Sequence, residues 1–344
     1  MIKSLELENF TVFEHAIFEL SEGINIVIGE NGTGKSHFLK AAYATVTSLY
    51  CPLQPNEIEP FIQVKLSDTF KMPSLDAYVL CRNNKDFTMT IIVEHLGEID
   101  KVYINYHGGG MGFSGRKGRE ERLSLNLLFI PSKEVLSIYP NFVSLYEKYH
   151  LSFDETYYDL CKALDNPLLK KLDEPAQALL HDLEMIIGGQ VIVQGGHFYI
   201  KQLDSEQLMD IGMVAEGHRK IAMLAYLIAN DSIVKGCTLF WDEPETNLNP
   251  RLMRQLAKAL AALAKYGVQV ILATHSYFLM KEISLLNQQD SEIPARFFSL
   301  IKTEEQGVKV EQADNLTDLQ TIVSLDEELD QYDRDQALYY KKAS

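Results

Sequence analysis

The sequence lacks the features that mark secreted, membrane-spanning, disulfide-stabilised and zinc-stabilised proteins. Its four cysteines, Cys51, Cys81, Cys161 and Cys237, are widely spaced and form no C-x-x-C pair, so neither a disulfide framework nor a zinc site is indicated. No segment approaches the roughly 20 apolar residues of a spanning helix. The N-terminus, MIKSLELENF, has no signal-peptide core. Because scattered free cysteines fit a reducing compartment, we expect a cytoplasmic protein that does not bind a membrane.

Positive charge is also scarce. The chain has 32 Lys and Arg against 48 Asp and Glu, a net charge of −16, which argues against broad, nonspecific binding to DNA. A local basic patch is not excluded, because Arg116, Lys117, Arg119 and Arg122 cluster at the end of a glycine-rich segment, 107–118, that we predict to be a mobile loop. This cluster is either solvated or a contact to nucleic acid or a protein partner.

The most informative stretch is Gly29–Ser36, G-E-N-G-T-G-K-S, which fits the phosphate-binding pattern G-x-x-x-x-G-K-S. It follows an apolar strand candidate, 23–28, and precedes a predicted helix, 37–49. In this order the backbone N–H groups can surround an anion, and the helix N-terminus adds partial positive charge. Lys35 is predicted to contact the β- and γ-phosphates, and Ser36 to ligate Mg²⁺. The predicted ATP-binding residues are Asn31, Gly32, Thr33, Gly34, Lys35, Ser36 and His37.

Two further strand ends carry candidate catalytic groups. The apolar segment 237–241 ends at Asp242 and Glu243, and the segment 268–274 ends at His275. In parallel sheets ligands lie at the carboxyl ends of strands, so we expect all three side chains beside the phosphate-binding loop. Asp242 is predicted to hold Mg²⁺, Glu243 to act as general base toward water, and His275 to sense the γ-phosphate.

The length of 344 residues exceeds the roughly 250–300 residues at which single cores stop growing. The order of strand and helix signals predicts an α/β protein with an antiparallel meander after the first helix and a helical region over 133–187. No long heptad run is present. The predicted strands and hairpins lie at 2–8, 16–20, 61–66, 77–82, 87–96, 101–106, 125–130, 190–203 and 296–311, and a terminal acidic helix at 326–335.

Taken together, these motifs resemble the ABC-type ATPase heads of the SMC/RecF/OLD-like branch, and in particular bacterial AAA-family ATPases of the anti-phage defence type. The motifs that carry the resemblance are L-x-N-F, I-G-E-N-G-T-G-K-S, F-I-P-S-K-E, D-E-P-E-x-N-L-N-P and A-T-H-S. The resemblance implies a P-loop NTPase fold with a mixed or parallel core sheet, an inserted β-meander and a helical lobe. Only 69 of the 344 residues follow His275, too few for a Toprim nuclease.

The resemblance also implies three parts and a shared site. These are an N-terminal ATPase lobe (1–130), a helical lobe with a hairpin (131–210) and a C-terminal ATPase lobe (211–344). The signature-like turn, 214–219, would contact the nucleotide of a second copy through Ala215, Gly217 and Arg219. Its usual serine and the following glycine are replaced by Ala215 and Glu216, and Arg219 is a candidate to compensate. No glutamine marks the expected Q-loop after 125–130.

The function implied is ATP hydrolysis by a homodimer or higher even-numbered assembly. Its role would be to control a separate effector, a nuclease or a toxin, in bacterial anti-phage defence. One alternative is a RecF-like DNA-repair ATPase that clamps DNA, so nucleic acid remains a candidate partner. A transporter ATP-binding subunit is the third possibility. It requires a membrane partner, and the long meander and the D-E-P-E-x-N-L-N-P motif argue against it.

Overall fold

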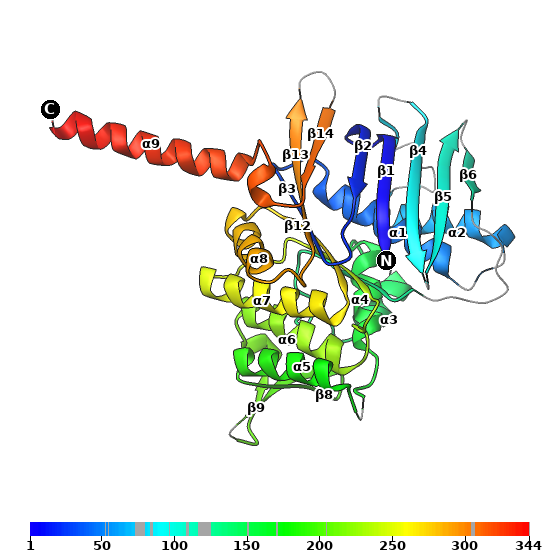
Figure 1. The fold of residues 1–344 in the computed structure, drawn as a ribbon. Coiled ribbons are helices and arrows are strands. Elements are labelled where there is room, and N and C mark those ends of the chain that lie inside the picture. The colour runs from blue at the N-terminus through cyan, green and yellow to red at the C-terminus, as the bar shows by residue number, and fades with distance from the viewer. Residues whose placement is uncertain are drawn as a thin grey trace.

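The computed structural model describes residues 1–343 apart from 52, 54, 73–79, 83–84, 96, 108–109, 116–124, 150, 170, 204 and 304–306. Within these residues it contains a large mixed sheet and a separate small sheet (Figure 1). The strand order of the large sheet is β6-β5-β4-β1-β2-β14-β13-β3-β12-β11-β7. Its strands are β1 (Ile2–Phe10), β2 (Phe13–Glu19), β3 (Ile24–Gly29), β4 (Phe87–His95), β5 (Glu98–His107), β6 (Gly110–Ser114), β7 (Leu127–Ile130), β11 (Thr238–Asp242), β12 (Gln269–Thr274), β13 (Ala295–Thr303) and β14 (Gly307–Ala313).

Helices cover this sheet and form most of a lobe beside it, which confirms the predicted α/β class. The small sheet of the lobe is formed by β8 (Gly189–Gln194), β9 (His197–Gln202) and β10 (Leu208–Asp210). No helix in the described part of the chain has the length and apolar character to cross a bilayer. The helices are α1 (Lys35–Tyr50), α2 (Pro55–Phe70), α3 (Phe142–Tyr149), α4 (Glu155–Leu164), α5 (Glu174–Ile187), α6 (Glu216–Ala229), α7 (Pro250–Tyr266), α8 (Tyr277–Gln289) and α9 (Val323–Ala343), with short 3-10 turns η3 (Ile211–Met213) and η4 (Leu316–Asp318).

The centre of the sheet is parallel and buried on both faces. Along β3, Ile24, Ile26 and Ile28 belong to one apolar core with α5 to α8, whereas Val27 belongs to the core with α1 and α2. This alternation follows from the two-residue period of a strand. It explains why the interiors of β11 and β12, residues 239–241 and 270–273, are apolar at every position instead of alternating with polar residues.

Register brings three strand ends to one edge of the sheet. β12 pairs in parallel with β3, where Thr274 lies opposite Ile28, and with β11, where Ala273 lies opposite Asp242. The loop after β3, the turn after β11 and the turn after β12 therefore start at nearly the same level. All three carry residues that the sequence predicts to be functional.

The antiparallel part of the sheet differs from the prediction in two places. Segment 61–66, predicted as a strand, lies in α2, because Ile58, Ile62 and Leu66 recur every four residues and are buried on one face. Within the predicted loop 107–118, residues 110–114 form β6, which pairs with β5. The basic cluster at residues 116, 117, 119 and 122 lies outside the described residues, as do residues 77–79 of the predicted strand 77–82. Of its described half, 80–82, only Cys81 pairs, in an isolated bridge to Phe10.

The other predicted elements are confirmed. They include the two N-terminal strands, the helix after the phosphate-binding loop, the strand at 125–130 and the mostly helical region over 133–187. The hairpin across Gly195 and Gly196 is β8–β9, and its sheet gains the unpredicted β10. The hairpin at 296–311 is β13–β14, and the acidic terminal segment lies in α9.

Ion pairs join the helical lobe to the first two helices after the phosphate-binding loop. Lys40 on α1 contacts Asp154 at the start of α4 at 2.7 Å. Lys65 on α2 contacts Asp159 at 2.6 Å, and the Tyr43 hydroxyl donates to the same carboxylate at 2.7 Å. Because Lys65 is buried, these contacts are weakly screened by solvent and fix α4 relative to α1.

Gln269 ties the N-terminal strand to the parallel core. Its side chain is fully buried; its carbonyl accepts from Ile2 N at 2.8 Å, and its amide donates to Ile2 O at 2.7 Å and to Ser21 O at 2.8 Å. We expect Gln269→Leu to lower the free energy of unfolding by about 2–4 kcal/mol, since buried backbone groups lose their partners. Urea denaturation measures this, with Gln289→Leu on the exposed end of α8 as control. If both variants lower the free energy of unfolding equally, Gln269 does not stabilise the contact between the N-terminal strand and the parallel core.

Candidate functional site

The phosphate-binding loop is shaped by glycines that no other residue could replace without displacement. A Cβ on Gly29 would lie 2.8 Å from Leu300 O on β13. Gly34 has φ +90° and is the N-cap of α1, and a Cβ there would lie 2.5 Å from a methyl of Val12. The first turn of α1 has neither a side-chain cap nor an acidic residue. Its N–H groups and partial positive charge are therefore oriented toward the loop, as anion binding requires.

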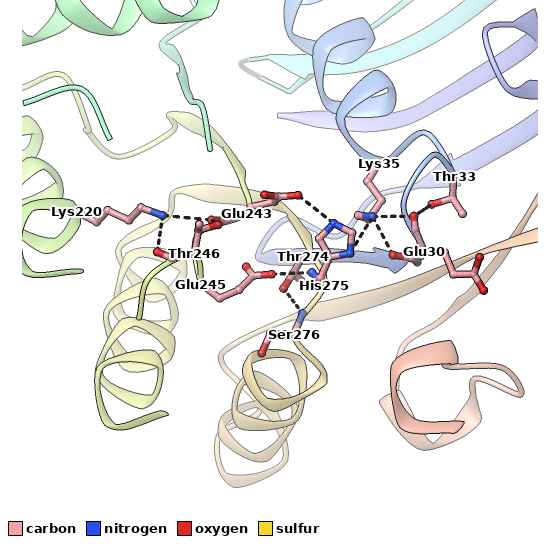
Figure 2. A network of polar contacts seen from close by, with 11 residues as sticks. Glu30, Thr33, Lys35, Lys220, Glu243, Glu245, Thr246, Thr274, His275 and Ser276 are labelled. Atoms are coloured by element: carbon pink, nitrogen blue, oxygen red, sulfur yellow. Dashed lines mark hydrogen bonds and ion pairs between the residues drawn. The ribbon is translucent and has the colours of Figure 1, made fainter. Parts of the chain in front are cut away.

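Lys35 lies at the centre of the site. Its ammonium donates to Gly29 O at 2.8 Å and to Glu30 O at 3.0 Å, and it lies 3.4 Å from His275 Nδ1 (Figure 2). The side chain is largely buried, and burial lowers the pKa of the ammonium, while the negative charges of Glu243, Asp242 and Glu245 oppose this shift. A cation held among carbonyls and carboxylates at the loop can reach a phosphate bound there.

His275 connects Lys35 to Glu243. Its Nε2 lies 2.9 Å from Glu243 Oε1, and its backbone N–H donates to Glu245 Oε1 at 2.6 Å (Figure 2). Because an ammonium can only donate, Nδ1 is the acceptor toward Lys35. The ring proton of the neutral imidazole therefore lies on Nε2 and is donated to the Glu243 carboxylate. The predicted trio of Lys35, Glu243 and His275 is thus brought together in one hydrogen-bonded chain.

Asp242 lies at the end of β11 and is only 8 % exposed. Burial raises the pKa of its carboxyl to about 6, while a hydrogen bond from Ser36 opposes the shift. Its Oδ1 is buried without a hydrogen-bond partner among the described residues. A hydroxyl beside a buried, unsatisfied carboxylate oxygen is a donor set of hard oxygens, which suits Mg²⁺. Ser36 and Asp242 therefore fit the metal that the sequence predicts.

Glu243 is held in a strained backbone conformation. Its φ is +48°, a left-handed value that is unfavourable for a residue with a side chain. Its carbonyl accepts hydrogen bonds from Thr246 Oγ1 at 2.9 Å and Thr246 N at 3.2 Å. Lys220, 1 % exposed on α6, donates to Thr246 O at 2.9 Å and lies 3.4 Å from Glu243 O (Figure 2). This buried ammonium helps to hold the turn that aims Glu243 at His275.

The signature-like turn contacts its own chain. Ala215 is the N-cap of α6 and provides no side-chain acceptor for the first helical N–H groups. A Cβ on Gly217 would lie 2.7 Å from Leu248, so the start of α6 packs closely on the loop after Glu243. Arg219 donates to Glu134 at 2.7 Å and to Val214 O at 2.7 Å. The structure thus gives Arg219 partners within its own chain.

A hollow of about 460 Å³ lies between these elements and is lined by Lys133, Glu216, Arg219, Glu243 and Asn247, among others. It brings the start of α6 and the segment after β7 to the same space as Glu243. Sequence reasoning left this segment unassigned, since it contains no glutamine. The structure shows that Glu134, whose side chain is 2 % exposed, is its contact with α6.

Other predicted residues lie around the loop with different contacts. The ring of His37 packs edge-on against Phe70 of α2, and burial lowers the pKa of its imidazole. Thr33 Oγ1 donates to Glu30 O at 2.8 Å and so closes the loop on itself, whereas Asn31 and Gly32 are exposed. Sequence reasoning missed Glu134, Lys220 and Lys302, which contact the site from distant segments, and Glu245 and Thr246, which lie just after Glu243 in the chain. Only Glu245, beside the paired acids, carried a local signal.

A glycine-rich anion loop that faces a buried aspartate places the chain in the class of P-loop nucleoside triphosphatases. Comparison with family models narrows the class: residues 1–174 match the AAA ATPase domain, and the chain belongs to this family of ATPases. Residues 116–281 match a second model, described as "AAA domain, putative AbiEii toxin, Type IV TA system". ATP hydrolysis is the activity of the family, as the sequence predicted.

Solved structures confirm the resemblance of fold to SMC heads. The SMC head domain from Thermotoga maritima has 14% sequence identity and a TM-score of 0.53, and the match covers 91% of this chain and 98% of that domain. An Smc head bound to the C-terminal domain of ScpA, derived from Pyrococcus furiosus, has 12% identity and a TM-score of 0.52, with 97% and 99% covered.

Curated relatives match over one short stretch. The DNA replication and repair protein RecF of Streptococcus pyogenes, serotype M1 among others, is 43% identical over 42 residues. This alignment spans 12% of the present chain and only 11% of RecF. It therefore supports a local resemblance and not a shared whole-protein function.

The contacts of Lys220 make a test of the Glu243 turn possible. We expect Lys220→Met to lower kcat at least about tenfold while KM for ATP changes less than about threefold, because the turn loses an anchor but the phosphate loop does not. Steady-state kinetics measure the split, and a thermal melt checks folding. Lys258→Met on the exposed face of α7 is the matched control. A rise in KM with unchanged kcat would contradict a role in positioning Glu243.

Proposed function

We propose that this ATPase is a nucleotide-gated switch: two copies close face to face around ATP, and closure controls a separate effector protein. The observation that carries the proposal is the division of the site. Lys35, His275 and Glu243 are joined by direct contacts on one side. The turn at 214–219 instead contacts Glu134 and the loop after Glu243. A second copy is the natural source of a signature turn for the first copy's nucleotide.

The roles proposed for the residues in cis follow from their chemistry. The loop 31–37 would surround the phosphates, with Lys35 on the β- and γ-phosphates. Ser36 and Asp242 would hold Mg²⁺, which when bound neutralises charge that develops on the phosphate oxygens. Glu243 would accept a proton from the attacking water, and His275, which donates Nε2–H to this carboxylate, would orient it.

The roles proposed in trans rest on α6. The uncapped first turn at Ala215 leaves N–H groups for a phosphate of the partner's nucleotide. Gly217 would allow the close approach, and Arg219 would supply the cation. Because Arg219 contacts Glu134 in cis, its use in trans requires exchange of one carboxylate for a phosphate. That exchange would link nucleotide binding to the segment after β7.

The separate effector is proposed to be a nuclease or a toxin, and the setting anti-phage defence. Support comes from the family description that matches residues 116–281, which names a toxin of a type IV toxin–antitoxin system. The local RecF match favours one alternative, a DNA-clamping ATPase. The two functions differ in one measurable property, the effect of DNA on ATP turnover. Stimulation of turnover by double-stranded DNA would favour the DNA-clamping ATPase.

The gating mechanism is tested with two variants. We expect Glu243→Gln to bind ATP normally and to lower kcat at least about a hundredfold, because the substitution removes the group that accepts a proton from water. Closure of the dimer precedes this proton transfer, so the variant should accumulate closed dimers. Lys35→Ala is expected to lose ATP binding and to remain monomeric. Light scattering with and without ATP and Mg²⁺, and with EDTA, provides the readout. Normal hydrolysis by Glu243→Gln would overturn the general-base assignment, and ATP-independent dimers would overturn the gating.

The proposed role of Arg219 in trans is separable from its ion pair in cis. In the Glu243→Gln background we expect Arg219→Ala to weaken ATP-driven dimerisation about tenfold or more, since a charge-assisted contact is lost. Glu134→Gln removes the negative charge of the cis partner but keeps the guanidinium, so dimerisation should be retained or strengthened. If both variants weaken dimerisation equally, Arg219 acts only by holding Glu134.

A further inference from the structure

The C-terminal helix α9 projects away from the body of the molecule (Figure 1). Its root is fixed, because Ile322 is buried and Leu325 packs against the main core. Beyond the root, residues 326–339 are exposed, apart from a half-buried Gln336. Helices of globular proteins are stabilised mainly by packing of an amphipathic face. The exposed part of α9 therefore lacks, within its own chain, the packing that stabilises most helices.

One side of α9 carries an apolar seam. Leu325, Leu329 and Tyr332 follow one another at spacings of four and three residues; the polar Gln336 takes the next position, and Tyr339 resumes the pattern. This is the seven-residue repeat with which helices pair. Leu329 is 55 % exposed and Tyr332 is 61 % exposed. Apolar side chains that lie in a row on an exposed helix indicate an interaction surface.

The charges beside the seam restrict the partner. The flanking positions in the described part of α9 are acidic: Asp326, Glu328, Asp333 and Asp335. Two copies of this helix would bring these carboxylates opposite one another in either orientation, which disfavours self-pairing. Nucleic acids and anionic membranes are repelled by the same charges. A protein surface with an apolar seam between Lys or Arg residues is complementary in both respects.

We propose that α9 is a docking helix for a protein partner that presents a basic amphipathic helix. Leu329 and Tyr332 form the apolar contact, and the four flanking carboxylates select a positively charged partner. The seam and the nucleotide site share no residues, so docking is testable without altering ATP turnover.

The test uses the full chain and a labelled synthetic peptide of three heptads, with Leu at the seam positions and Lys at the flanking ones. The same peptide with Glu at the flanking positions is the control probe. We expect fluorescence anisotropy to show binding of the Lys peptide only. Leu329→Gln/Tyr332→Gln should weaken it at least about tenfold. Asp333→Asn/Asp335→Asn should weaken it about threefold and reduce its salt dependence.

Leu338→Gln is the matched control variant, because Leu338 is 57 % exposed on the same helix but lies outside the seam. It should change the affinity less than about twofold. Circular dichroism and basal ATP turnover check that each variant keeps its helix and its fold. The proposal is overturned if the Glu peptide binds as well as the Lys peptide, if neither binds, or if Leu338→Gln matches the seam variant. It is also overturned if the wild type without nucleotide is a dimer that the seam variant converts to a monomer.

Discussion

The parallel pairing of β3, β12 and β11 is the constraint on which the rest of the site depends. It sets the phosphate loop, Asp242 and His275 at one edge of the sheet, because Thr274 lies opposite Ile28 and Ala273 opposite Asp242. A slip of one residue in either pair would turn every side chain of the strand to the other face. Burial on both faces prevents such a slip, since each face of β3 belongs to a different apolar core. The relative positions of the phosphate loop, Asp242 and His275 thus depend on hydrophobic packing along the strands, away from the site itself.

The site itself concentrates features that oppose stability. Burial lowers the pKa of Lys35 and of Lys220 and raises that of Asp242, so each charged form is destabilised by desolvation. Glu243 adds a left-handed backbone conformation. These costs are met locally: Lys220 donates to carbonyls of the strained turn, and His275 donates to Glu243. A bound nucleotide and cation would supply the partner that Asp242 Oδ1 lacks. Because such ligands bind the folded state, they would also raise the free energy of unfolding.

Much of the site could be predicted from sequence because its chemistry is local. The phosphate loop is a contiguous motif, and Asp242 and His275 each end an apolar strand. Lys220, Glu134 and Lys302 could not be found this way, since their contacts join segments that are distant in the chain. The strand predicted at 61–66 was wrong because β-branched and aromatic residues there gave a strand signal, whereas burial every fourth residue selects a helix. The ambiguity is physical: a short apolar run fits both periods, and tertiary packing decides.

Helix α8 links the nucleotide side of the molecule to the root of α9. Its N-cap, Ser276, follows His275 directly, and Ile283 in the middle of the helix shares a core with Leu316 and Ile322. Close-packed protein cores transmit displacements, since they contain few voids to absorb them. A bound nucleotide that moves His275 would therefore act on the same rigid element that supports the docking helix. Such coupling must be reciprocal: if ATP changes the affinity of α9 for a partner by some factor, the partner changes the affinity for ATP by the same factor.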